Sequence, residues 1–147
     1  MKLEFRLKDL DLINQEIKSN TWQRSEEFLV ENKHSLGKSG EEFAARIITE
    51  SGLHILTKNY RCHKGEMDII ARDGKVLVFI EVRTRSSSYR GWGEESITRQ
   101  KAQRLQAIAS HFILQQGYIS WPSIRFDVVA IRWNEKNPEI KWIKAAL

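Results

Sequence analysis

The stretch from Gly65 to Arg83 constrains the fold of this chain more than any other. Two runs rich in Ile, Val, Leu and Phe flank the pair Asp73-Gly74. An Asp-Gly pair supplies the positive φ angles that a tight two-residue hairpin turn needs. We therefore expect two antiparallel strands that are neighbours in a sheet and are joined at Asp73-Gly74.

Strand alternation divides the side chains of this hairpin between two faces. If Arg72 opposes Lys75, one face mixes charged and apolar residues: Glu66, Asp68, Ile70, Leu77, Phe79, Glu81 and Arg83. The other face is apolar throughout: Met67, Ile69, Ala71, Val76, Val78, Ile80 and Val82. A sheet with apolar residues on both faces must be covered on both. The hairpin therefore predicts a layered α/β domain.

The acids of the mixed face need a chemical explanation, because a buried carboxylate is costly unless a cation or basic partners compensate it. In this register Asp68 and Glu81 are diagonal neighbours, about 7 to 8 Å apart at the backbone, so both side chains reach one ion. We expect them to form a metal site, with Glu66 in a supporting position. A pair of salt-bridged acids at strand ends is the alternative.

Composition narrows the class of protein. With 147 residues, of which 41% are hydrophobic, the chain suits one compact domain. A net charge of +5 and a pI near 9.4 fit an anionic partner such as nucleic acid. The single cysteine, Cys62, and the lack of an apolar signal or membrane segment predict a cytoplasmic protein without a membrane partner.

The first part of the chain, residues 1–36, is nearly neutral and carries apolar residues at helical spacing. We interpret it as a helical extension, packed on the domain or on a second copy in a homodimer, or else only partly ordered. The domain proper then spans residues 37–147. It opens with a helix from about Gly40 to Glu50 behind an N-cap at Ser39.

Glu41 starts the buried stripe of this helix, since Ala44, Ala45 and Ile48 follow it at helical spacing. Two interpretations stay open. Glu41 either interacts favourably with the helix N-terminus or lies beside the strand acids.

Further elements follow from the same patterns. Strands are expected over residues 53–61, 125–133 and 139–144, and a helix over 94–116 that ends at Gly117. The loop 84–93 is basic and aromatic, and Arg85, Arg90 and Trp92 suit contacts with phosphates and bases. Lys101 and Arg104 near the start of the second helix extend this basic rim, although snorkelling also explains Lys101.

A helix acid, then Asp68, then Glu81-Val82-Arg83 resembles the D…(D/E)xK pattern of restriction-endonuclease-like nucleases. Several segments, in order and spacing, are similar to the YraN-like family of bacterial proteins: Gly40-Glu41, 65–68, 79–85, Lys101 and 125–129. The resemblance covers roughly residues 37 to 133.

The resemblance implies a restriction-endonuclease-like fold, close to Holliday junction resolvases, with a mixed central sheet flanked by helices. It also implies that Asp68 and Glu81 are metal ligands and that Glu41 completes the site. The expected cofactor is Mg²⁺ or Mn²⁺, because carboxylates without paired Cys or His favour these ions. The expected activity is hydrolysis of phosphodiesters in DNA, branched DNA included.

Arg83 departs from the nuclease pattern, which has lysine at this position. Arginine stays protonated, so Arg83 cannot act as a general base, although it can hold a phosphate. A catalytically silent nucleic-acid-binding module of the same fold is therefore the alternative function.

Overall fold

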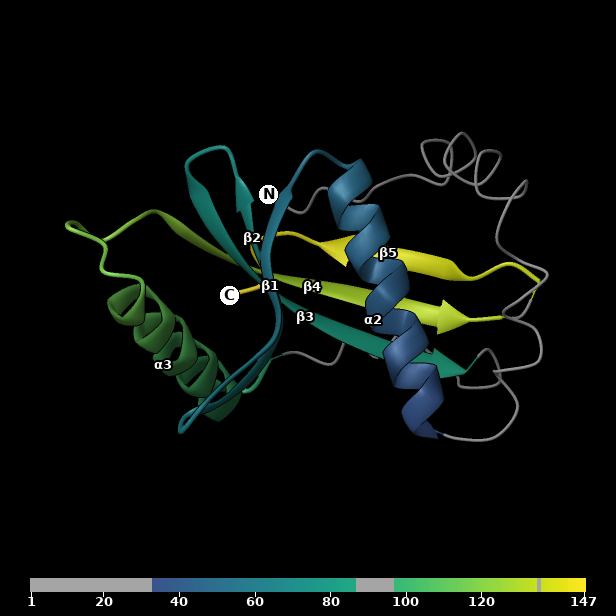
Figure 1. Cartoon of the computed structure of the whole chain (residues 1–147). Helices are drawn as coiled ribbons and strands as arrows, with labels where there is room; N and C mark the ends of the chain where they lie inside the picture. Colours follow the sequence, from purple (N-terminus) through teal and green to yellow (C-terminus); the bar gives the residue numbers. More distant parts are fainter. Residues whose placement is uncertain (1–32, 87–96, 135) are drawn as a thin grey trace.

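The computed structural model describes residues 33–86, 97–134 and 136–147 (Figure 1). The elements in these ranges are, in chain order, α2 (Lys33–Glu50), β1 (His54–Cys62), β2 (Gly65–Asp73), β3 (Val76–Ser86), α3 (Arg99–Gln115), β4 (Ile124–Trp133) and β5 (Glu139–Ile143). The strands form one sheet in the order β1-β2-β3-β4-β5. Only β3 and β4 pair in parallel. The predicted mixed α/β sheet flanked by helices is confirmed.

The sheet is covered on both faces, as its two apolar faces require. One hydrophobic core lies between α2 and the sheet and contains Phe43, Ala44, Ile48, Ile69, Val78, Ile80, Val129 and Trp142. The other lies between α3 and the sheet and contains Met67, Ile70, Leu77, Phe79, Leu105, Ile108, Phe112 and Phe126. We call these the α2-side core and the α3-side core. Figure 1 shows α2 crossing the strands while α3 lies near the β1–β2 hairpin.

The hairpin register differs from the prediction by two residues. Asp73 opposes Val76, and the turn consists of Gly74, which has φ 58°, and Lys75. Because the shift is even, the apolar side chains from Ile69 to Ala71 and from Val76 to Val82 stay on their predicted faces. Met67 is an exception, since it packs in the α3-side core.

Helix α2 begins at Lys33, so the predicted start near Gly40 is wrong. The segment 37–40 does not break the helix but lies inside it. Gly40 has a packing reason instead: a Cβ there would lie 1.9 Å from Oγ1 of Thr84. Glycine thus allows α2 to approach β3 closely. The division of the chain at residue 37 stays a prediction, because residues 1–32 lie outside the described residues.

Helix α3 begins at Arg99, not at Glu94 as predicted. Its N-cap is Thr98, whose side chain accepts a hydrogen bond from the backbone N–H of Lys101 at 3.2 Å. The end of the helix is confirmed, since Gln116 caps it and Gly117 follows with φ 70°. In the described ranges, no helix has the length and apolarity to cross a membrane.

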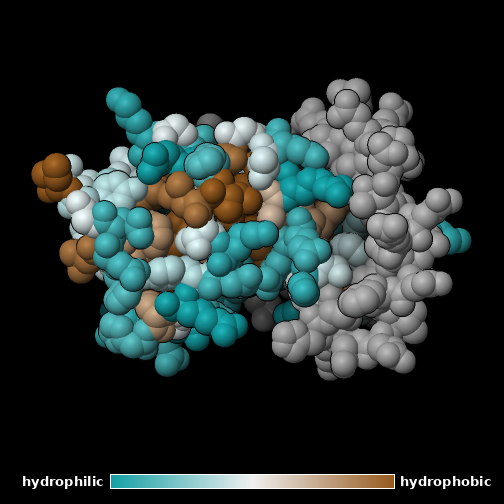
Figure 2. All heavy atoms as spheres, in the orientation of Figure 1, coloured by the Kyte–Doolittle hydropathy of each residue, from teal (hydrophilic) through white to brown (hydrophobic). Residues whose placement is uncertain are grey.

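Hydrophilic side chains cover most of the described surface in Figure 2, with hydrophobic ones gathered at its centre and at a projection on its left. The loop between α3 and β4 projects on that side in Figure 1. This loop carries Ile119, which is fully exposed, and Trp121, which is 56% exposed. Neither residue belongs to the site that the sequence predicts.

Candidate active site

Asp68 lies where the regular alternation of β2 is interrupted. Met67 packs in the α3-side core, Ile69 in the α2-side core and Ile70 in the α3-side core again. The predicted face of Met67 is therefore wrong. Asn59 of β1 lies opposite Asp68, between the paired residues on either side of it, and has the left-handed φ of 53°. This irregularity frees the Asp68 carboxylate from strict alternation.

The carboxylate of Asp68 turns toward β3. The backbone N–H of Val82 donates a hydrogen bond to its Oδ2 at 2.7 Å. Extending the observed β2–β3 register by one residue places Asp68 opposite Glu81. The two acids are thus direct cross-strand neighbours, closer than the diagonal pair that the sequence predicts.

Burial raises the pKa of Asp68 from 3.8 to about 6. The Val82 hydrogen bond opposes this shift, while the negative charges of Glu41, Glu81 and Glu66 add to it. Asp68 therefore lies in a desolvated region surrounded by other acids. A cation would stabilise such a region, because it would offset the negative charges.

Glu81 has its two carboxylate oxygens in different environments. Its side chain is 18% exposed, and Oε1 contacts both Nζ of Lys101 and Nε of Arg83, the latter at 3.3 Å. Oε2 is buried and has no hydrogen-bond partner. A buried carboxylate oxygen without a partner is unfavourable. The burial of Oε2 is therefore not compensated by any hydrogen bond from the described residues.

Glu41 comes from α2, on the opposite side of the hairpin from Lys101. It follows Gly40, at which α2 closely approaches Thr84 of β3. Its charge contributes to the raised pKa of Asp68, so the two carboxylates lie near each other. The alternative role at the helix N-terminus is wrong, because α2 begins eight residues earlier and the end effect fades within one turn.

The donor set fits a hard divalent cation in its chemistry. Asp68, Oε2 of Glu81 and Glu41 would supply carboxylate oxygens, which Mg²⁺ and Mn²⁺ prefer. Within residues 33–86, 97–134 and 136–147, however, no three His, Cys, Asp or Glu side chains already lie in a metal-binding arrangement. Binding a cation therefore requires these side chains to adjust.

The basic residues that the sequence assigns to nucleic acid fall into different places. Lys101 points to Glu81 instead of joining an outer rim. Arg85 and Arg104 are exposed, and Arg85 donates to the carbonyl of Thr84 at 3.3 Å. Arg90 and Trp92 lie outside the described residues, so their predicted roles stay predictions.

Glu66 lies at the surface, away from the buried part of the site. It forms an ion pair with Arg61 at 3.3 Å, and both side chains are more than 60% exposed. Its influence on the site is the charge that helps to raise the pKa of Asp68. The supporting role of Glu66 stays a prediction.

A second ionic cluster is centred on Asp127. Asp127 is 2% exposed and accepts hydrogen bonds from Arg125, Trp142 and the backbone N–H of Ala145. Arg125 also contacts Asp73 at 3.0 Å. The signal in the sequence was the Arg-x-Asp spacing, which puts both side chains on one face of β4. All its bonds are internal, so the cluster braces the sheet.

The β1–β2 hairpin tip packs on α3, which the sequence did not predict. The rings of His63 and His111 lie 5.1 Å apart, and Tyr60 Oη lies 2.6 Å from Nδ1 of His111. Lys64 precedes Gly65, whose Cβ position would lie 3.7 Å from Cδ of Arg104. The tip therefore places Lys64 beside the basic start of α3.

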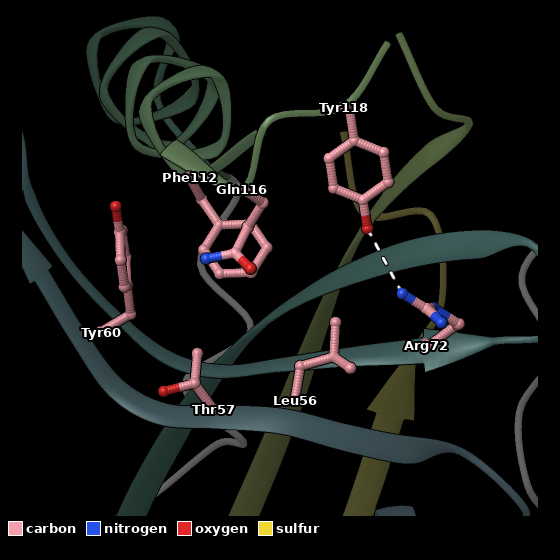
Figure 3. A pocket seen from close by; sticks show the side chains of 7 residues that line it. All are labelled: Leu56, Thr57, Tyr60, Arg72, Phe112, Gln116 and Tyr118. Carbon is pink, nitrogen blue, oxygen red and sulfur yellow. Dashed lines mark hydrogen bonds between the residues drawn. The ribbon is translucent and has the colours of Figure 1, made fainter. Parts of the chain in front are cut away.

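A cavity of about 270 Å³ opens between β1 and the C-terminal half of α3 (Figure 3). Its lining residues are Leu56, Thr57, Tyr60, Arg72, Phe112, Gln116 and Tyr118. At 1.5 Å per helical residue, Gln116 lies about 22 Å along α3 from Lys101. The cavity contains no carboxylate and is separate from the acids.

Comparison with known proteins places the chain among relatives. The family model described as "Uncharacterised protein family UPF0102" matches residues 40–131. The chain belongs to this family, the YraN-like proteins. The match spans Glu41, Asp68, Glu81 and Lys101 and thus the whole candidate site.

Individual relatives agree. A UPF0102 protein of Desulfitobacterium hafniense strain Y51 is 53% identical over 117 residues, which cover 78% of this chain and 97% of that protein. UPF0102 proteins of Caldicellulosiruptor saccharolyticus and Anaeromyxobacter dehalogenans are 43% and 40% identical, covering 78% and 79% of this chain and 98% and 86% of theirs. The predicted family is confirmed.

Proposed function

We propose that the protein is a metal-dependent endonuclease that hydrolyses phosphodiesters in DNA, with branched DNA as the first substrate class to test. The observation that carries this proposal is the meeting of Asp68 and Glu81 in a desolvated place, with Oε2 of Glu81 buried and unpaired. Glu41 follows Gly40, at which α2 closely approaches β3, and its negative charge adds to the raised pKa of Asp68.

The residues divide the work as follows. Asp68, Glu81 and Glu41 would hold the divalent cation, which when bound would activate water and offset charge on the phosphate oxygens. Arg83 contacts Oε1 of Glu81 at 3.3 Å and so orients this carboxylate. The hydrogen bond from Val82 N–H fixes the Asp68 carboxylate in the direction of β3.

A basic surface beside the acids supports a nucleic-acid partner. Lys64, Arg99 and Arg104 are exposed, and the ion pairs in the described part of the chain do not involve them. Helix α3 has no acidic residue, and its basic residues gather near its N-terminus, where the helix dipole disfavours them. A bound phosphate backbone would compensate this cost.

The competing function is a silent nucleic-acid-binding module of the same fold. The contact of Lys101 and Arg83 with Oε1 of Glu81 favours it, because both cations neutralise the carboxylate without any metal. The two functions share the DNA surface and differ only in cleavage.

Cleavage of linear, nicked and four-way-junction DNA separates them. The wild type should cut at least one of these with Mg²⁺ or Mn²⁺ and none with EDTA, while Asp68→Ala and Glu81→Ala should not cut. Glu42→Ala, at the exposed residue next to Glu41, is the matched control and should cut normally. Cleavage that persists in both site variants would disprove the site, and binding without cleavage in every metal would favour the silent module.

The salt dependence of DNA binding tests the basic surface. Each of the replacements Lys64→Ala, Arg99→Ala and Arg104→Ala should reduce the magnitude of the slope of log K against log salt. The expected reduction is about 0.9, the value for one phosphate contact. Lys136→Ala, in the turn between β4 and β5, is the control and should leave the slope unchanged. Unchanged slopes in all three variants would remove this surface from the interface.

A further inference from the structure

The backbone and the side chain of Lys101 both have partners. The backbone N–H of Lys101 donates a hydrogen bond to the hydroxyl of Thr98, the N-cap residue. The Nζ of Lys101 contacts Oε1 of Glu81 across the space between α3 and β3. The side chain is 29% exposed, so its ammonium is within reach of solvent. It therefore links the candidate metal ligand to the open side of the site.

A purely structural ion pair does not account for this arrangement. Two cations, Lys101 and Arg83, share Oε1 of Glu81, while Oε2 is buried and has none. A lysine in the first turn of a helix also lies at the unfavourable end of the helix dipole. Helix α3 does not need a lysine at position 101 in order to form. Oε1 of Glu81 also has a second cationic partner, Arg83.

The two cations differ in their freedom to move. The Arg83 side chain is 11% exposed and that of Lys101 29% exposed. Lysine is a compact charge on a flexible stem, whereas the guanidinium keeps a rigid fork. Lys101 can therefore leave Glu81 and turn outward more readily than Arg83.

We propose that Lys101, on α3, is the lysine that contacts a phosphate of bound DNA. Strand β3 has no lysine for this role, because Arg83 occupies the position two residues after Glu81. In the free protein the Lys101 ammonium neutralises Glu81. When Glu81 binds a divalent cation, Lys101 is released and donates a hydrogen bond to a phosphate oxygen of bound DNA. This inference rests on the proposed function and deepens it, since it adds a catalytic residue to the same site.

Two opposite effects follow from this exchange. Lys101 competes with the cation for Glu81, so its removal should strengthen cation binding in the absence of DNA. Lys101 also contributes a phosphate contact only when the cation is present, so its removal should weaken DNA binding only under that condition. An ion pair that merely stabilises the fold could also produce the first effect, but it would not produce the second.

The test compares Lys101→Met and Lys101→Arg with the wild type, using Lys75→Met, at the exposed lysine in the turn between β2 and β3, as the matched control. Calorimetric titration of Mn²⁺ into DNA-free protein should give a Kd about tenfold lower for Lys101→Met, as expected for a lost coupling of about 1.4 kcal/mol. Lys101→Arg and Lys75→Met should match the wild type. A Kd for Lys101→Met that is unchanged or higher would overturn the proposal.

The second measurement is the salt slope of junction-DNA binding, with Ca²⁺ or with EDTA. The wild-type slope should exceed that of Lys101→Met by about 0.9 with Ca²⁺ and should equal it with EDTA. A slope difference that is the same in both conditions would overturn the exchange. Neither measurement needs cleavage, so a wild type that cuts no DNA would refute the nuclease activity and leave these results to decide the role of Lys101.

Discussion

Replacing Asp68 with asparagine should stabilise the fold, and only above the pH at which an ordinary aspartate ionises. The fold raises the pKa of Asp68 from 3.8 to about 6, chiefly through burial. The folded protein therefore holds a proton more tightly than the unfolded chain. As pH rises from about 4 to about 6, the charged form penalises the fold progressively, and above about 6 the full penalty applies.

The size of the effect follows from the shift. A displacement from 3.8 to about 6 corresponds to about 3 kcal/mol, at about 1.4 kcal/mol per unit. Asparagine retains an oxygen that accepts the hydrogen bond from Val82 N–H, so the variant loses the charge and keeps the contact. We expect Asp68→Asn to raise the free energy of unfolding by about 3 kcal/mol at pH 7.5, or the Tm by about 10 °C.

Urea unfolding at pH 4 and at pH 7.5 provides the assay, with Glu42→Gln as the control that removes an exposed acid from α2. The gain from Asp68→Asn should be present at pH 7.5 and nearly absent at pH 4, and the control should change little at either pH. A gain of equal size at both pH values, or a loss at pH 7.5, would refute the account of a desolvated acid among acids.

Two further variants test the packing around the site by urea unfolding. Gly40→Ala should lower the free energy of unfolding by about 1 to 3 kcal/mol, because the added Cβ would lie 1.9 Å from Oγ1 of Thr84. Adding Thr84→Ala should recover part of this loss. Additive losses for the two substitutions would contradict the clash. Asp127→Ala should lower the free energy of unfolding by about 3 to 5 kcal/mol, because it leaves buried donors unpaired. Asp73→Ala, at a side chain that is 41% exposed, should lower it by less than about 1 kcal/mol. Equal losses would contradict the bracing role of Asp127.

The faces of the hairpin could be predicted from the sequence because alternation depends only on parity. The turn uses Gly74 and Lys75 where the prediction used Asp73 and Gly74, yet the shift of two residues kept Ile70, Leu77 and Phe79 together on one face of the hairpin. The break at Asp68 could not be predicted in this way. It depends on the pairing with β1 and on the left-handed conformation of Asn59, neither of which is local to β2.

The helix starts show where local signals mislead. Gly40 and its neighbours have low helix propensity, but the packing of α2 on β3 overrides propensity and uses the missing Cβ. In α3, the sequence predicted a start at residue 94, whereas Thr98 is the N-cap. The contact of Lys101 with Glu81 depends on where α3 begins and on how α3 packs on the sheet. The sequence therefore identified both residues but did not predict that they are in contact.

The central claim is that Asp68 and Glu81, with Glu41, hold a divalent cation for phosphodiester hydrolysis. Anomalous diffraction from crystals soaked in Mn²⁺ tests it most directly. We predict a peak bonded to the Asp68 carboxylate and to Oε2 of Glu81, and no peak there in Glu81→Gln crystals under the same soak. No peak at saturating Mn²⁺, or a peak bonded to other residues, would contradict the account.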